Sequence, residues 1–152
     1  MKRIRTEHWY PYAPLETWSV LADFDSYADW NPLNIQAHGE ARLGARIPMT
    51  FINPARPGST VAQTVTITAC EAGRQLAWRG HVPLLFRGDH FFNLAPEREG
   101  TRLLHGEDSS GLIPATFSAA LIAQNFVPAY EAANCALGER LAQLYPGRRT
   151  AT

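Results

Sequence analysis

The sequence has few cysteines and no net charge, and each of these features argues against a class of function. Cys70 and Cys135 are the only cysteines in 152 residues, and neither belongs to a CxxC motif or a Cys/His ligand spacing, so we expect no disulfide framework and no zinc site. Both are expected to be free, buried thiols. Net charge is also absent: Lys+Arg 14 equals Asp+Glu 14, which gives no overall electrostatic argument for binding nucleic acid or an anionic membrane.

Long hydrophobic runs are missing as well. The basic N-terminus, residues 1–8, is not followed by the apolar run of a signal peptide, and no stretch approaches the length of a membrane span. A soluble, cytoplasmic protein is therefore expected. The sequence has no nucleophile elbow, no phosphate-binding glycine-rich loop and no HExxH motif, so acyl transfer, nucleotide binding and metalloprotease chemistry have no support. It predicts no cofactor and no bound metal.

The composition that is present is that of an ordinary globular domain. Hydrophobic residues make up 45% and charged residues 18% of the chain. A chain of this length buries about 70% of the surface that its unfolded form exposes, which is enough for a hydrophobic core that needs no disulfides or structural metal. Since no repeat, low-complexity tract or boundary signal appears, residues 1–146 are predicted to form one domain, followed by a flexible tail at 147–152.

The longest periodic stretch, residues 114–144, predicts one amphipathic helix around which the rest of the chain packs. Its apolar positions recur every three or four residues, which places them on one face. Pro114 suits the first turn, and Pro146 ends the helix after Leu144. Pro128 falls inside the pattern and predicts a kink, because proline cannot donate to the carbonyl one turn earlier. The buried face is predicted to comprise Phe126, Tyr130, Asn134, Leu137, Leu141 and Leu144.

Upstream of this helix, the pattern predicts two short helical segments and about seven strands. Residues 3–12 predict a first strand, Pro14 begins a short helix, and a second helical turn runs to Asp29, before Trp30-Asn31-Pro32. Hairpin-like turns separate the later strands, which favours an antiparallel meander over a parallel βαβ sheet. Their inward faces are predicted to be Ile47, Met49 and Phe51, then Val61, Gln63, Val65 and Ile67, then Leu76, Trp78 and Gly80, then Gly88, His90, Phe92 and Leu94, and last Leu103, His105 and Glu107.

Several stretches, in this order, carry a resemblance to a known family. The opening with Pro14, Trp18 and Trp30-Asn31-Pro32, the stretch Leu76-Ala77-Trp78-Arg79-Gly80, and residues 86–96 and 100–112 resemble the START-like (SRPBCC) superfamily and, within it, the polyketide cyclase/dehydrase-like proteins. The resemblance implies an α+β helix-grip fold, in which a curved seven-stranded antiparallel sheet wraps a long C-terminal helix, with two short helices after the first strand. It also implies a cavity that holds a lipid, sterol, polyketide or other apolar molecule. Some members of the family are enzymes.

The inward positions predict the wall of such a cavity, because they are mostly aromatic with a few polar groups. His105 and Glu107 share one face of a strand, and His90 is expected beside them on the adjacent strand. Either Glu107 orients a histidine that acts as general base, or the three only satisfy one another's hydrogen bonds. A metal triad is disfavoured, since this spacing is common. The candidate ligand-binding residues are Trp30, Met49, Phe51, Trp78, His90, Phe92, His105, Glu107, Phe117 and Phe126.

The leading hypothesis is a binding module for a small apolar, lipid- or polyketide-like molecule. The alternative is a cyclase or dehydratase that uses His90, His105 and Glu107 as acid/base groups, and a weaker one is an interaction domain that pairs with protein partners. An exposed strand edge would also support a homodimer. The enzyme hypothesis requires that the three polar side chains converge around open space and do not simply pack against one another.

Overall fold

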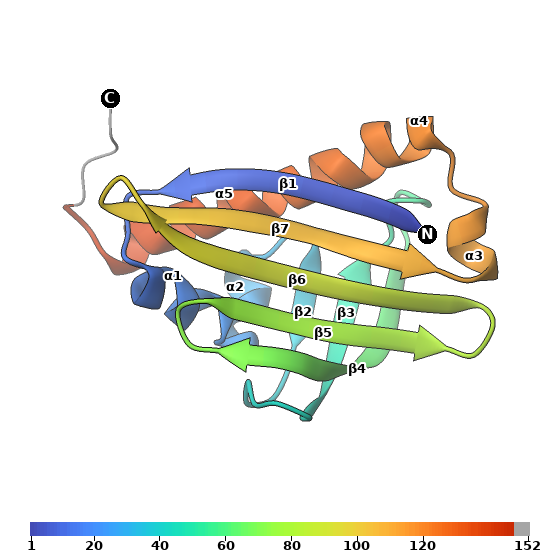
Figure 1. The fold of residues 1–152 in the computed structure, drawn as a ribbon, viewed down its shortest axis with the longest axis horizontal. Coiled ribbons are helices and arrows are strands. Elements are labelled where there is room, and N and C mark those ends of the chain that lie inside the picture. The colour runs from blue at the N-terminus through green and yellow to red at the C-terminus, as the bar shows by residue number, and fades with distance from the viewer. Residues whose placement is uncertain (148–152) are drawn as a thin grey trace.

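Seven antiparallel strands form a single curved sheet, which the C-terminal helix crosses (Figure 1). The computed structural model describes residues 1–147. The strands follow the order β1-β7-β6-β5-β4-β3-β2, so β2 to β7 form a meander of neighbours and β1 closes against β7. This is the predicted α+β helix-grip fold. The strands are β1 (Lys2–Tyr10), β2 (Asn34–Ala37), β3 (Arg46–Ile52), β4 (Thr60–Glu71), β5 (Gln75–Val82), β6 (Phe86–Glu97) and β7 (Gly100–Ser110).

The predicted alternation along the strands is confirmed at the inner face. Successive side chains of a strand point to opposite faces, so buried residues recur at every second position. This holds in the buried part of each strand from β3 to β7, although Val61, predicted to face inward, is 43% exposed and Gly106 is buried beside His105. The antiparallel register pairs Trp78 with His90, and His90 with Glu107. The buried inward residues are Ile47, Met49, Val65, Ile67, Leu76, Trp78, His90, Phe92, Leu94, Leu103 and His105.

Three short helical segments join β1 to β2. They are α1 (Pro14–Leu21), the 3-10 turn η1 (Phe24–Ser26) and α2 (Tyr27–Trp30). Pro14 occupies the first helical turn as predicted, where its missing N–H needs no partner. The second helix extends one residue beyond Asp29, to Trp30, before the chain becomes extended at Asn31.

The C-terminal helical region differs from the single helix predicted over 114–144. Its first turn is a separate helix, α3 (Leu112–Ala115), and the long helix begins at α4 (Ala119–Leu121), passes through the π-helical turn η2 (Ile122–Phe126) and continues as α5 (Val127–Leu144). The predicted start was wrong because Ser118 caps the helix: its Oγ accepts a hydrogen bond from the N–H of Leu121 at 3.0 Å. The predicted end at Leu144 is confirmed.

Pro128 lies in the first turn of α5, directly after the π-helical turn. Proline cannot donate the hydrogen bond that an uninterrupted α-helix needs at this position. A π-helical turn widens the helix locally and is frequent at functional sites. The irregularity expected near Pro128 therefore takes the form of a widened turn, which carries Phe126 into the interior.

The interior under the sheet consists of two hydrophobic clusters. The larger one packs α1, η1 and the last turns of α5 against the strands, with Tyr10, Trp78 and Leu141 fully buried. The smaller one joins β1 and the chain before β2 to η2 and the start of α5, through Ile4, Leu33 and Phe126. The smaller cluster leaves space between sheet and helix, and the candidate site lies there.

Several other expectations concern the chain as a whole. Both cysteines are free, as expected, but neither is fully buried: Cys70 is half-buried, and Cys135 is exposed in the middle of α5. Among residues 1–147 no helix is both long and apolar enough to cross a bilayer. The tail predicted at 147–152 lies outside the described residues, apart from Gly147.

Candidate functional site

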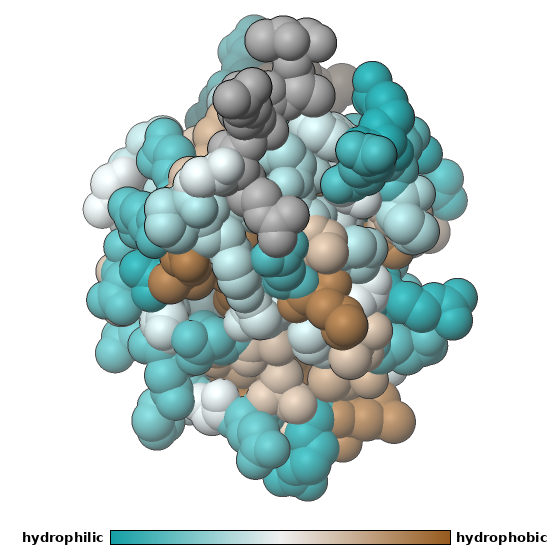
Figure 2. Space-filling model, turned by 90° about the vertical axis from the view of Figure 1, so that its left-hand side faces the viewer, coloured by the Kyte–Doolittle hydropathy of each residue, from teal (hydrophilic) through white to brown (hydrophobic). Residues whose placement is uncertain are grey.

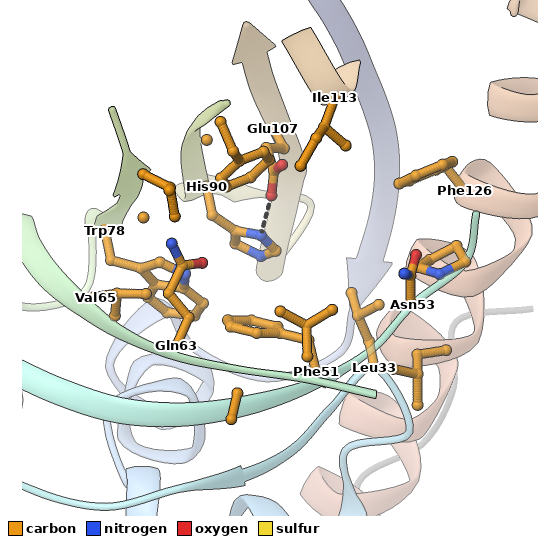
Figure 3. A pocket seen from close by; sticks show the side chains of 18 of the residues that line it. Leu33, Phe51, Asn53, Gln63, Val65, Trp78, His90, Glu107, Ile113 and Phe126 are labelled. Atoms are coloured by element: carbon orange, nitrogen blue, oxygen red, sulfur yellow. Dashed lines mark hydrogen bonds and ion pairs between the residues drawn. The ribbon is translucent and has the colours of Figure 1, made fainter. Parts of the chain in front are cut away.

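A cavity of about 310 Å³ opens between the sheet and the helical region, at the end of the molecule that carries the β5–β6 hairpin and α3. Its volume lies at the lower end of the range for small-molecule sites, about 300–1,000 Å³. Strands β3 to β7 supply one wall, and α3, η2 and α5 supply the other. Figure 3 shows Trp78, Val65 and Phe51 on the sheet side and Phe126 on the helix side. The lining is therefore mostly apolar and aromatic.

The structure brings six of the ten predicted site residues to this cavity and leaves four outside its lining. Trp30 packs edge-on against Tyr27, Met49 lies deep in the larger cluster, and Phe92 and His105 stack on each other behind the cavity wall. Met49, Phe92 and His105 face the interior as the alternation predicts, but they lie in its filled part, and Trp30, at the end of α2, is half-buried against the larger cluster. The residues that line the cavity are Phe51, Trp78, His90, Glu107, Phe117 and Phe126.

A hydrogen-bonded chain of polar side chains runs from the filled interior to the cavity. It begins at Asn134 on α5, whose Nδ2 donates to Thr6 Oγ1 at 2.9 Å, while that hydroxyl donates to the carbonyl of His105 at 2.9 Å. The amide oxygen of Asn134 lies 2.7 Å from His105 Nδ1. Tyr10 fixes the helix at the same point by donating to the Asn134 carbonyl at 2.8 Å.

The chain continues through the two histidines to the cavity wall. His105 Nε2 and His90 Nε2 are 2.8 Å apart, and His90 Nδ1 lies 3.2 Å from Glu107 Oε2. The hydroxyl of Tyr130 donates to the same carboxylate oxygen at 3.0 Å. Figure 3 shows His90 and Glu107, with the contact between them, at the edge of the cavity. His90 and Glu107 line the open space, whereas His105 and Asn134 are buried behind them.

The partners fix the direction of the protons along this chain. Since the nitrogen of the Asn134 amide is occupied by Thr6, its oxygen faces His105, and His105 Nδ1 must donate to it. Burial, and next the charge of His90, hold the pKa of His105 well below its usual value, so this ring is neutral and its Nε2 is an acceptor. His90 therefore donates from Nε2 to His105.

This arrangement leaves one proton to be shared at the cavity wall. His90 Nδ1 and Glu107 Oε2, at 3.2 Å, make a favourable contact only if one proton lies between them, on the imidazole or on the carboxyl group. Tyr130 donates a hydrogen bond to Glu107 but does not give up its proton, because burial and the neighbouring Glu107 raise the pKa of its hydroxyl well above the usual value. The arrangement can bind a polar group of a ligand or exchange a proton with it.

Ring stacking and a missing side chain hold this pair in place. His90 stacks on Trp78 with 4.7 Å between ring centroids and 6° between planes, which fixes the imidazole against the sheet. Gly88 leaves room for the carboxylate: a Cβ at this position would lie 2.9 Å from Glu107 Oε1 and 2.6 Å from Phe86 Cζ. Both rings and the carboxylate are thus positioned by the strands β5 to β7.

Sequence reasoning missed Tyr130 and Asn134 as site residues, although it placed both on the buried face of the helix. Nothing in their spacing distinguishes a polar residue that completes a network from one that is only buried. A signal was present: a buried amide and a buried phenol on the face toward two histidines and a glutamate need partners there. Among residues 1–147 no group of three or more His, Cys, Asp or Glu side chains is placed to hold a metal ion.

Comparison with known structures identifies the fold that carries this site. Neither the protein-family models nor the curated protein sequences give a match to this chain. Among solved structures, a START superfamily protein from Mycobacterium smegmatis has a TM-score of 0.75 at 16% identity, covering 93% of this chain and 98% of that one. The chain has a START-like fold. The protein TTHA0849 from Thermus thermophilus shares the START-like architecture, with a TM-score of 0.76 at 17% identity over 95% of this chain and 99% of that one.

A third similar structure is DynU16, a protein in the dynemicin biosynthetic locus. Its TM-score is 0.70 at 15% identity, and the match covers 98% of this chain but 50% of DynU16. At such identities the likeness shows the START-like fold alone, so the role of each side chain has to come from its contacts in this molecule.

Proposed function

We propose that this chain binds a small molecule with an apolar body and one polar end in the cavity between sheet and helix. The observation that carries the proposal is the asymmetry of the cavity wall: most of the lining is aromatic or aliphatic, the amides of Asn53 and Gln63 also border the space, and Glu107, hydrogen-bonded to His90, is the only carboxyl group that the described residues contribute to the lining. The START-like fold supports the proposal, and a lipid- or polyketide-like compound has the required chemistry.

The ligand's position follows from this asymmetry. Its body lies against Phe51, Trp78 and Phe126, and its polar end, a hydroxyl or a similar donor, meets the carboxylate of Glu107. Oε2 of that carboxylate already interacts with Tyr130 and His90, so Oε1 is the oxygen left for the ligand. A ligand without a donor would leave a partly buried carboxylate short of a partner, which is unfavourable.

Titration with 2-naphthol, an aromatic molecule with one hydroxyl, tests the site. The Phe126→Leu variant should bind 2-naphthol about tenfold more weakly, because aromatic area buried against the ligand is lost. The matched control is Phe91→Leu, since Phe91 lies on the outer face of β6, away from the cavity. The guanidinium carbon of Arg5 lies 4.8 Å from the centroid of the Phe91 ring. Equal affinity of both variants and the wild type would contradict the assignment of the site.

A second candidate function is proton transfer in the same cavity, as in a cyclase or dehydratase. The proton shared by His90 and Glu107 at the edge of open space favours it, since an aldol-type cyclisation begins with removal of a proton next to a carbonyl. In that reaction the Glu107–His90 pair takes the proton, and His105 and Asn134 act as positioning residues.

Exchange of the methyl protons of 2-acetylnaphthalene for deuterium in heavy water, followed by NMR, tests this second function. The wild type should accelerate the exchange over the buffer rate, and Glu107→Gln should abolish the acceleration while it still binds the ketone. Wild-type exchange at the buffer rate in the presence of demonstrated binding would leave the binding module as the function.

A further inference from the structure

Half of the exposed large hydrophobic residues of the described chain gather at one end of the molecule. Leu84 is 85% exposed and Leu112 64% exposed, and their neighbours are also open to solvent. The two segments that carry them are joined, because the N–H groups of Leu112 and Ile113 donate to the carbonyls of Leu84 and Leu85 at 3.0 and 2.9 Å. We call this surface the apolar tip; it consists of Val82, Leu84, Leu85, Leu112 and Ile113.

The hairpin that forms the tip contains a leucine in a strained backbone conformation. Val82 to Leu85 make a turn closed by the Leu85 N–H and the Val82 carbonyl at 3.1 Å, and Leu84 has a φ of 65° at its third position. A turn of this kind favours glycine there, since a side chain is strained at positive φ. A leucine that is strained and almost fully exposed contributes neither turn geometry nor core packing. Exposed apolar residues that serve neither purpose are typical of contact surfaces.

The tip is continuous with the cavity. Val82 and Ile113 belong to both, and Phe86 extends the same apolar surface from the hairpin into the cavity. An apolar molecule can therefore pass from the tip to the cavity along hydrophobic side chains. Figure 2 shows the opposite end, where hydrophilic side chains cover both sides and apolar ones form a band through the middle and lower right of the view.

Charge around the tip is unbalanced, although the whole chain has a formal net charge of zero. Figure 1 shows the N-terminus, the β5–β6 hairpin and α3 at the same end of the molecule. Arg79 and Arg87 flank Asp89 beside the hairpin. On β1, Arg3 and Arg5 flank Asp108, and Lys2 pairs in register with Ser109. Five cations and three carboxylates, Asp89, Glu107 and Asp108, thus lie on the halves of these strands that are nearest the tip.

We propose that the apolar tip docks onto an anionic lipid surface, from which the cavity exchanges its ligand. Aliphatic side chains with arginine and lysine on the adjoining strands β1, β5 and β6 fit the boundary between acyl chains and anionic headgroups. A second copy of the chain fits less well, because a standard protein interface uses about 20–30 residues a side and like charges would meet across it. The exchange rests on the proposed function, and the tip shares Val82 and Ile113 with the cavity wall, whereas Leu84 and Leu112 lie outside the cavity lining.

Sedimentation with lipid vesicles tests the proposal. The wild type should bind vesicles of equimolar phosphatidylcholine and phosphatidylglycerol more tightly than vesicles of phosphatidylcholine alone, and added salt should weaken the binding. Leu84→Gly and Leu112→Asp should each weaken it about tenfold or more, since each removes one inserted leucine. Leu84→Gly also relieves the positive φ, so loss of binding cannot be attributed to unfolding.

Leu15→Asp is the matched control. Leu15 and Leu112 are both 64% exposed and both lie in the first turn of a helix, but α1 is at the opposite end of the molecule (Figure 1). This variant should bind vesicles like the wild type. The proposal is overturned if the wild type binds neither vesicle, if the tip variants bind like Leu15→Asp, or if Leu84→Gly instead abolishes a dimer detected by light scattering. Phe126→Leu should bind vesicles normally, which distinguishes failure of the ligand site from failure of the tip.

Discussion

The interior of this protein is solid at one end of the sheet and open at the other, although the same strands and the same helix bound both parts. At the filled end, Tyr10, Leu103 and Leu141 are at most 1% exposed and pack with the short helices α1 and η1. At the open end, no helix of residues 1–147 fills the space between Phe51 and Phe126, and a cavity of about 310 Å³ remains. The sheet and the long helix provide walls at both ends, and the packing of α1 and η1 fills one of them, whereas α3 only borders the cavity at the other.

The boundary between the two ends is polar. Asn134, His105 and His90 cross it in one hydrogen-bonded chain that ends at Glu107 and Tyr130 on the cavity side. Buried polar groups usually have partners, and Thr6, His105 and Asn134 satisfy one another at the filled side of the boundary. Only the last pair of the chain faces open space, so the same network is structural at one end and available to a ligand at the other.

Truncating one leucine at each end gives the largest contrast. Leu137→Ala, at the filled end of α5, should lower the free energy of unfolding by about 2–5 kcal/mol, because it adds a new cavity to a packed core. Leu33→Ala should cost less, near the lower limit of that range, since Leu33 already borders open space. Urea unfolding of both variants measures the difference. Equal losses would contradict the division into filled and open ends.

Replacing Glu107 with glutamine sharpens the comparison at the boundary. The wild type should bind 2-naphthol about ten- to a hundredfold more tightly than naphthalene, as expected if the ligand's hydroxyl donates to a carboxylate whose shared proton lies on His90. Glu107→Gln should reduce this ratio toward unity without loss of naphthalene binding. Calorimetric titration measures the two affinities. A ratio unchanged in Glu107→Gln would show that the ligand's hydroxyl does not meet this carboxylate.

Because His105 is buried, we expect the stability of the protein to depend on pH. Because the folded state holds the pKa of His105 well below 6.5, the unfolded chain binds more protons than the folded one as the pH falls below about 6.5. Stability from this residue is complete above that pH and declines below it, by up to about 1.4 kcal/mol per pH unit. His105→Gln should flatten the decline in urea unfolding between about pH 5 and 7.5. His8, whose pKa burial also lowers, contributes to the slope that remains.

Much of this fold could be predicted from the sequence, because strand alternation and helical periodicity report burial directly. The inward positions of His90, His105 and Glu107 followed from that alternation and are where it placed them. The start of the long helix could not be predicted, since Pro114 also suits the turn of α3, and the Ser118 cap competes with it only in the folded chain.

Which of the inward residues line the cavity could not be predicted from the sequence, for a different reason. Alternation separates inward from outward residues, but Phe92 and His105 face inward as fully as His90 and Glu107 do. Whether an inward side chain meets a packed core or open space depends on which helix covers it, and that depends on contacts between distant segments. Tyr130 was missed for the same reason.

Native mass spectrometry of freshly purified protein tests the central claim most directly. The mass of the intact protein is compared with its mass after denaturation, and any released molecule is identified; protein stripped of ligand is then offered 2-naphthol. We expect one bound molecule per chain, small enough for a cavity of about 310 Å³, with an apolar body and a hydrogen-bond donor at one end. A bare protein that also takes up no 2-naphthol would contradict the claim that the open end is a ligand site.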